Sequence, residues 1–206
     1  MDYSKDEMRI HSLFPTAIGE TVREVTNKEK EFFKKLQNEP RRKNHGNAFT
    51  QDNHVLDKSE LNDLKIDLTD ITNNYFKTVY KPKFDAEIYI TISWVNYTET
   101  GEFHHAHSHS NSIISGVYYI ETDESDRILF ESPNLNSLGL KVRPNEFNHW
   151  NSTEWWWETP KNNVVIFPSS LVHRVAPTTN KNVRVSLAFN TFIKGTISDE
   201  LVELIL

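Results

Sequence analysis

The second half of the chain is a series of short β-prone runs, and this pattern limits the folds that the sequence can adopt. The first run, AEIYITISWVNY (86–97), alternates in twos and is rich in β-branched and aromatic residues, which is typical of a strand. Shorter runs of the same kind, separated by turn-forming residues, follow at 114–121, 127–131, 138–142, 163–167 and 183–192. Many short strands at this spacing favour an antiparallel sandwich or barrel. The sequence therefore predicts a mainly β fold with a jelly-roll core.

The N-terminal third has the character of helices. The segment TNKEKEFFKKLQNE (26–39) is typical of an amphipathic helix. A longer helix is expected to begin near Asp57 or Ser59, either of which can serve as its N-cap, and to end at Pro82. Apolar residues three and four apart form one stripe along it: Leu61, Leu64, Leu68, Ile71 and Tyr75. We expect these helices to pack on the outside of the β core.

The 206 residues fit a single domain with enough apolar content for a core of its own. Within it we expect helical support over 1–85, the β core over 86–195 and a C-terminal tail over 196–206. The tail ends in LVELIL, an apolar stretch that could dock on its own core or on a second subunit. A homodimer is therefore one expected state.

Composition excludes several classes of function. Without cysteine the chain has no thiolate nucleophile and no disulfide framework. A net charge of −6 argues against nucleic acid as a partner, and we interpret PRRK (40–43) as ordinary solvated surface. No apolar run approaches 18 residues, and the N-terminus MDYSKDEMRIHSLF is charged. We therefore expect neither a membrane span nor a secretory signal, and a cytoplasmic location.

Four histidines crowd into FHHAHSHSNSIISGVYYI (103–120), in a chain that has nine in all. Histidines at i and i+2 near the end of a strand, such as His107 and His109, can turn toward one point where the alternation of faces breaks down. A third ligand would have to come from a distant strand. His173 is a candidate, because it follows a Pro-containing turn directly after the apolar run NVVIF. Imidazole suits iron, copper, nickel and zinc, so the ligand type alone does not name the metal. Each histidine taken singly could equally be structural.

Arg184 and Ser186 lie two apart in VRVSLAFN and therefore share one face of the predicted strand. An inward-facing arginine is costly unless an anion pairs with it, and that strand contains no acidic residue. The fork of a guanidinium beside a hydroxyl suits a carboxylate. An arginine that points into solvent is the alternative.

Taken together, these stretches resemble the iron(II)- and 2-oxoglutarate-dependent oxygenases. The resemblance lies in Trp94-Val95-Asn96, HSHSNSIISGVYY from His107, FPSSLVHRV from Phe167 and RVSLAFN from Arg184, and LFPTAIG (13–19) also resembles the start of one subgroup. It implies a double-stranded β-helix, Fe(II) as cofactor, 2-oxoglutarate and O2 as cosubstrates, and hydroxylation of the primary substrate, which is the family's usual reaction. The primary substrate, a small molecule or a peptide or protein side chain, stays unidentified.

Matched residue by residue, the resemblance makes His107, His109 and His173 the catalytic metal ligands. It gives Arg184, Ser186 and Tyr119 to the side carboxylate of 2-oxoglutarate, and it makes Asn96 a lining residue. His109 stands where the family usually has a carboxylate, so it could ligate the metal or stand off and hydrogen-bond a bound group. For His104 and His105 we expect solvent exposure, with a hydrogen bond that supports a metal ligand, or a contact to substrate, as the alternative for one of them.

Two other classes of protein fit part of the pattern. GEFHHAHSH (101–109) fits the opening of a cupin metal site, although the glutamate expected after it is missing and a cupin would not require Arg184 and Ser186. A jelly-roll binding module without catalysis is the other alternative, for which the aromatic segment FNHWNSTEWWWETP (147–160) could be a contact surface, although three adjacent tryptophans are more often partly core and partly lid.

Overall fold

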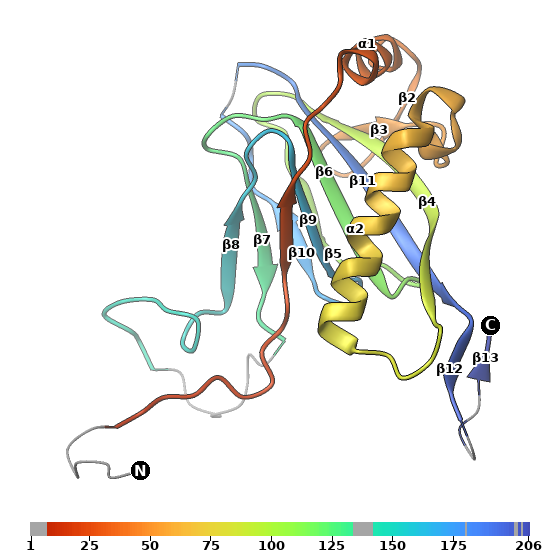
Figure 1. Cartoon of the computed structure of the whole chain (residues 1–206). Coiled ribbons are helices and arrows are strands. Elements are labelled where there is room, and N and C mark those ends of the chain that lie inside the picture. Colours follow the sequence, from red (N-terminus) through yellow and green to blue (C-terminus); the bar gives the residue numbers. More distant parts are fainter. Residues whose placement is uncertain (1–7, 134–141, 180, 200–201, 203) are drawn as a thin grey trace.

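The computed structural model describes residues 8–133, 142–179, 181–199, 202 and 204–206. Most of its described strands form two antiparallel sheets that face each other, with helices on the outside of one of them (Figure 1). This arrangement confirms the predicted mainly β fold with a jelly-roll core and external helices. None of the helices in the described part of the chain is long and apolar enough to cross a membrane.

The larger sheet has seven strands within the described residues. Their spatial order is β1 (Gly19–Val22), β9 (Asn163–Pro168), β6 (Ile114–Glu121), β11 (Arg184–Lys194), β4 (Glu87–Thr98), β3 (Ala48–Thr50) and β2 (Arg41–Lys43). The smaller sheet has the order β5 (His104–His107), β10 (His173–Val175), β7 (Arg127–Glu131) and β8 (Glu154–Glu158).

The two faces of the larger sheet differ in chemistry because side chains alternate along each strand. On β11, Val185, Leu187 and Phe189 belong to the main apolar core, which the helices cover. The intervening side chains of Arg184 and Ser186 are also buried, but they line a pocket instead. Buried polar residues thus gather on the face that looks toward the smaller sheet.

Helix α1 (Asn27–Leu36) begins at Thr26, whose hydroxyl accepts a hydrogen bond from the backbone of Glu29 while the Glu29 carboxylate accepts one from the backbone of Thr26. This capping box satisfies two backbone donors at the start of the helix. Glu29 is buried and also pairs with Arg23, at 2.7 and 2.8 Å. The predicted helix over 26–39 is therefore present, although it ends three residues early.

Helix α2 (Asn62–Tyr80) lies across the larger sheet and buries Leu64, Leu68 and Tyr75 of the predicted stripe (Figure 1). The expected N-cap was wrong. Asp57 and Ser59 belong to two short 3-10 turns, η1 (Val55–Asp57) and η2 (Ser59–Leu61), and no side chain caps the α-helix itself. The helix ends at Tyr80, with Lys81 as its C-cap directly before Pro82, as predicted.

Strands β6 and β7 span the predicted residues, and β4, β9 and β11 differ from the expected runs by one or two residues at their ends. The run expected at 138–142 lies, apart from Val142, outside the described residues. The short strands β1, β2, β3, β5, β8 and β10 were not predicted, and neither were the two short strands of the C-terminal tail. PRRK, expected as plain surface, contributes the edge strand β2, where the Arg41 guanidinium lies 4.8 Å from the centroid of the Tyr97 ring.

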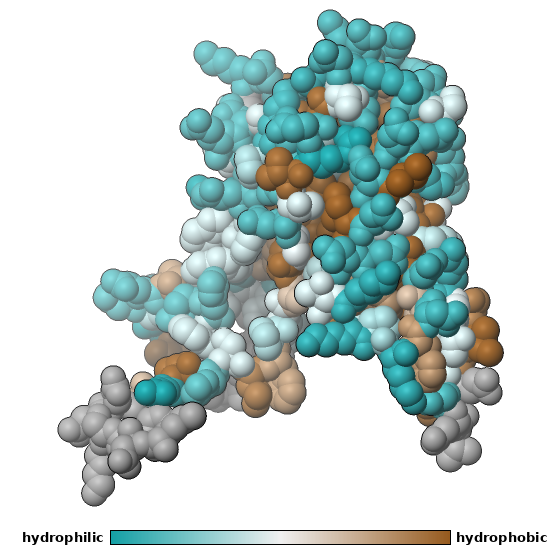
Figure 2. Space-filling view, in the orientation of Figure 1, coloured by the Kyte–Doolittle hydropathy of each residue, from teal (hydrophilic) through white to brown (hydrophobic). Residues whose placement is uncertain are grey.

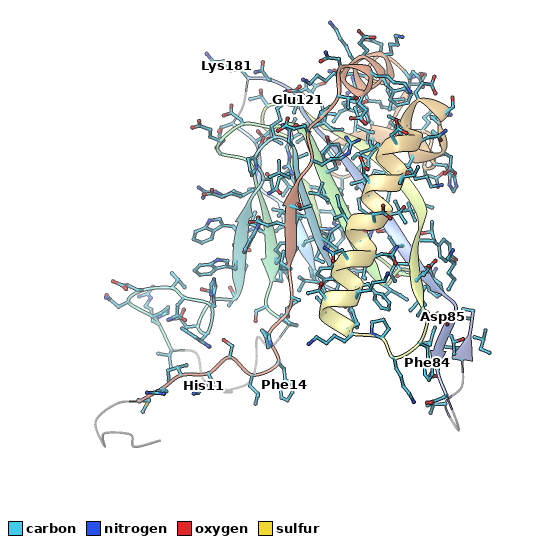
Figure 3. All side chains as sticks on the ribbon, viewed as in Figure 1. His11, Phe14, Phe84, Asp85, Glu121 and Lys181 are labelled. Carbon is cyan, nitrogen blue, oxygen red and sulfur yellow. The ribbon has the colours of Figure 1, made fainter. Side chains whose placement is uncertain are left out.

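The described residues of LVELIL are exposed and do not dock on the main core, although Ile197 earlier in the tail packs against it. The described residues of the tail form a small sheet of β12 (Thr196–Ser198) and β13 (Leu204–Ile205), which leaves apolar side chains of Leu204 and Ile205 exposed. Figure 2 shows this apolar surface at the end of the molecule where β13 lies. Phe84 and Asp85 lie in the loop beside these strands (Figure 3), and Lys83 in the same loop forms an ion pair with Asp199 at 2.7 Å.

Candidate active site

Three histidines converge between the sheets. His107 ends β5, His109 follows it in the loop, and His173 starts β10, where it pairs with His107. Each offers one ring nitrogen to a cluster in which these atoms all lie within 4.8 Å of one another. Because β5 and β10 are hydrogen-bonded neighbours, their register brings together residues that are 66 positions apart in the chain.

Backbone carbonyls fix two of these rings. His107 Nδ1 lies 2.8 Å from the carbonyl oxygen of His105, and His173 Nδ1 lies 2.9 Å from that of Leu171. A carbonyl oxygen can only accept, so Nδ1 donates in both rings and Nε2 is left as the lone-pair nitrogen. This is the arrangement by which proteins orient metal-binding imidazoles.

The cluster is neutral at physiological pH. Burial, together with smaller contributions from neighbouring histidines, lowers the pKa of His173 to about 3 and that of His109 to about 4. Burial also lowers the pKa of His107. Neutral imidazole is the form that ligates a metal, so no proton has to leave these rings near pH 7.

Arg184 lies in the same pocket as the histidines, on β11 opposite Thr98 of β4. Its side chain is buried, and neither Nε nor Nη1 has a hydrogen-bond partner. The next row of the sheet contains Asn96, Ser186 and Tyr119 on adjacent strands. The Tyr119 hydroxyl and the side-chain oxygen of Asn96 are also buried without a partner. A group of buried polar atoms therefore faces the pocket.

Tyr119 stays protonated at neutral pH. Burial raises the pKa of this phenol to about 12, although the positive charge of Arg184 opposes the rise. The hydroxyl can therefore donate a hydrogen bond into the pocket.

The residues present fit the two groups that the sequence implied. Three neutral imidazoles on one point form a donor set that iron and related transition metals accept. A buried guanidinium with two unpartnered nitrogens is costly by itself and favours an anion, and its fork matches a carboxylate. The pocket thus suits a metal at one end and an acid group at the other.

The expectation that His104 and His105 are solvent-exposed was wrong, because both are half-buried. The His104 ring stacks on that of His107, with 4.4 Å between centroids, and its Nε2 lies 3.0 Å from the side-chain nitrogen of Asn44. Burial lowers the pKa of His104 to about 3. Their burial follows from their place in strand β5, and this strand is too short to be recognised in the sequence by its periodicity.

The aromatic segment expected as a contact surface or lid contains strand β8. Its tryptophans 155 and 157 are half-buried, whereas Trp156 and Trp150 are exposed. Trp155 and Trp157 line a groove together with His11 and Phe14, which lie on the extended N-terminal segment (Figure 3). Phe130 borders both this groove and the ring of His173, with 6.3 Å between ring centroids, so the groove runs beside the histidine cluster.

Solved structures with a similar fold include enzymes that depend on alpha-ketoglutarate, which is 2-oxoglutarate, or were solved with it bound. A non-heme alpha-ketoglutarate-dependent carbocyclase, SnoK from nogalamycin biosynthesis, matches with a TM-score of 0.60 and 13% identity over 85% of this chain and 79% of its own. HygX from Streptomyces hygroscopicus, solved with nickel and 2-oxoglutarate, matches with a TM-score of 0.58 and 8% identity over 85% and 82%. A Pseudomonas putida prolyl-4-hydroxylase matches with a TM-score of 0.54 and 11% identity over 85% and 92%.

These likenesses define the fold as the double-stranded β-helix of this class of enzyme. Residues 92–190, which include the histidine cluster and Arg184, match the model of a family described as 2OG-Fe(II) oxygenase, where 2OG stands for 2-oxoglutarate. The match over residues 92–190 and the shared fold indicate a 2OG-Fe(II) oxygenase, that is, a 2-oxoglutarate-dependent dioxygenase that uses Fe(II) as cofactor and 2-oxoglutarate as cosubstrate. No curated protein sequence matches it.

Proposed function

We propose that His107, His109 and His173 hold the iron of this oxygenase, and that Arg184, Ser186 and Tyr119 hold the far carboxylate of 2-oxoglutarate. One observation carries the proposal: a cluster of neutral imidazoles shares a pocket with a buried guanidinium whose Nε and Nη1 have no partner. The nearness of all three ring nitrogens supports His109 as a ligand in place of the usual carboxylate.

When bound, iron supplies the activation of O2 that couples conversion of 2-oxoglutarate to succinate and CO2 with oxidation of the primary substrate. The chain's own residues do the rest. Arg184 neutralises the far carboxylate, and the Ser186 and Tyr119 hydroxyls can donate to it, so that the 2-oxo acid end of the molecule is directed toward the imidazoles. Asn96 lines the pocket on the neighbouring strand, and burial of these groups keeps water out.

Uncoupled turnover tests the proposal. The protein with Fe(II) should release succinate from 2-oxoglutarate in air, and His173→Ala and Arg184→Ala should each abolish this release. Titration with Fe(II) and 2-oxoglutarate without O2 should give a visible charge-transfer band in the wild type only. Metal binding without any response to 2-oxoglutarate would instead favour a cupin-like role for these residues, and failure to bind metal would favour a binding module.

We also propose that the primary substrate is a small molecule or a peptide or protein side chain, because the net charge of −6 disfavours nucleic acid. A candidate that speeds succinate release would identify the class. The exposed apolar side chains of β13 support a homodimer, which light scattering on the intact chain and on a chain shortened at Lys194 tests. A cytoplasmic location stays a prediction.

A further inference from the structure

Asn47 is a buried amide that the sequence pattern did not single out. It precedes β3 and is 4% exposed, and it lines the pocket that contains Arg184. Neither its side-chain nitrogen nor its side-chain oxygen has a hydrogen-bond partner. A buried amide with both ends unpaired is costly, so it requires a reason.

The sheet register places Asn47 on the same face as Arg184. Phe49 pairs with Asn96, and side chains that pair across strands share a face, so Asn47, two residues before Phe49, shares that face too. The residue at the corresponding level of β4 is Thr98, which pairs with Arg184 on β11. Asn47 thus stands one strand beyond Thr98, at the end of the pocket where the guanidinium lies.

The hairpin of β2 and β3 is attached firmly enough to fix this position. Gly46 adopts φ +104°, and a Cβ there would lie 2.6 Å from the backbone oxygen of Phe103, so only glycine allows the close approach. The Phe103 backbone donates to the Gly46 carbonyl at 3.0 Å, and Asn44 contacts His104 at 3.0 Å. The turn is therefore tied to β5, the strand that ends at His107.

We infer that Asn47 is a further cosubstrate-binding residue, whose side-chain N–H donates to the far carboxylate of 2-oxoglutarate beside Arg184. This rests on the proposed function. It assigns a role in cosubstrate recognition to a hairpin that lies outside residues 92–190, the part of the chain that the family model matches. The binding pocket is then closed at its inner end by the β2–β3 hairpin rather than by the β core alone.

Two ligands separate this role from a structural one. Zn(II)-loaded protein is titrated by calorimetry with 2-oxoglutarate and with 2-oxopentanoate, which has a methyl group in place of the far carboxylate. Asn47→Ala should weaken binding of 2-oxoglutarate roughly 10- to 100-fold, the range for a hydrogen bond to a charged group, and leave 2-oxopentanoate unchanged. Thermal unfolding of the metal-free variant should match the wild type, because the lost amide has no protein partner.

Asn190→Ala is the matched control. Asn190 is also a buried asparagine of the larger sheet, but its side-chain oxygen accepts from Ser115 at 2.8 Å. This variant should lose thermal stability and keep the ratio of the two affinities. The inference is overturned if Asn47→Ala weakens both ligands equally, or if it lowers stability without changing the ratio. A wild type that binds both ligands equally well would overturn the proposed function, and this inference with it.

Discussion

The guanidinium carbon of Arg184 lies 5.3 Å from the centroid of the Tyr119 ring, and both side chains are buried. The positive charge of the guanidinium is attracted electrostatically to the face of the aromatic ring. The tyrosine hydroxyl nevertheless keeps no hydrogen-bond partner in the protein. Adjacent strands therefore present a fixed charge and a fixed donor to the same pocket, which is a preorganised arrangement for an acid group.

Replacement of Tyr119 by phenylalanine should affect ligand binding more than folding. The hydroxyl lacks a protein partner, so its removal should leave the melting temperature unchanged, whereas 2-oxoglutarate should bind about tenfold more weakly. Tyr118→Phe is the control, since Tyr118 faces the opposite core and donates to the Arg23 carbonyl at 3.0 Å. That variant should lose stability and keep its affinity. The reverse pattern would contradict the assignment of Tyr119.

Metal loading should stabilise the protein against heat. A metal that binds only the folded state, supplied at 100 times its dissociation constant, adds about 2.7 kcal/mol to the free energy of unfolding. Addition of EDTA should remove this gain, and His107→Ala or His173→Ala should remove both the gain and the bound metal. His54→Ala, at an exposed histidine outside the cluster, should keep both. An unchanged metal content in His173→Ala would argue against the cluster as the site.

The buried pair of Glu29 and Arg23 should make stability depend on acid. Burial alone would raise the pKa of Glu29, but its hydrogen bonds from Arg23 and Thr26 hold that pKa below the usual value of 4.5. The unfolded state therefore binds the proton first, and the stabilisation is complete above about pH 4.5 and is lost as pH falls through the lower, folded-state value.

Glu29→Gln should consequently cost about 3 kcal/mol at pH 7, and the gap to wild type should narrow below pH 4.5. Urea unfolding at several pH values measures this. Glu31→Gln, on the exposed side of α1, should unfold like the wild type at each pH. A gap that stays constant from pH 7 to pH 3 would show that the charge of Glu29 contributes nothing.

Gly116→Ala should destabilise the larger sheet. A Cβ at Gly116 would lie 2.2 Å from the Phe189 ring on the adjacent strand, so the ring would have to move. Such overpacking costs about 1–3 kcal/mol. In the double variant with Phe189→Leu, the loss at Gly116 should be smaller than in the wild-type background, which urea unfolding can check. Additive losses would mean that the ring is not the obstacle.

The sequence alone predicted the features that depend on local patterns of residues. The alternation over β6 and β7 and the stripe on α2 follow from side-chain periodicity, and the motif spacing singled out the three histidines that the structure brings together. Strands of three or four residues, such as β3 and β5, are too short to carry a periodic signal. Asn47 and His104 depend on which strands become neighbours, a long-range property that no local pattern contains. The roles of the site residues in binding iron and 2-oxoglutarate stay predictions.

Alternate side chains of strand β11 face the apolar core and the pocket, so the enzyme is sensitive to a shift of one residue in the register of this strand. Such a slip would turn Val185 into the pocket and force the charge of Arg184 against the layer beneath α2, so chemistry and folding would fail together. In a correctly folded chain, the register of β11 therefore already orients Arg184 toward the pocket. Variants that weaken the packing of the helices on the sheet should therefore lower the yield of folded protein, and should not give a folded enzyme in which Arg184 points away from the pocket.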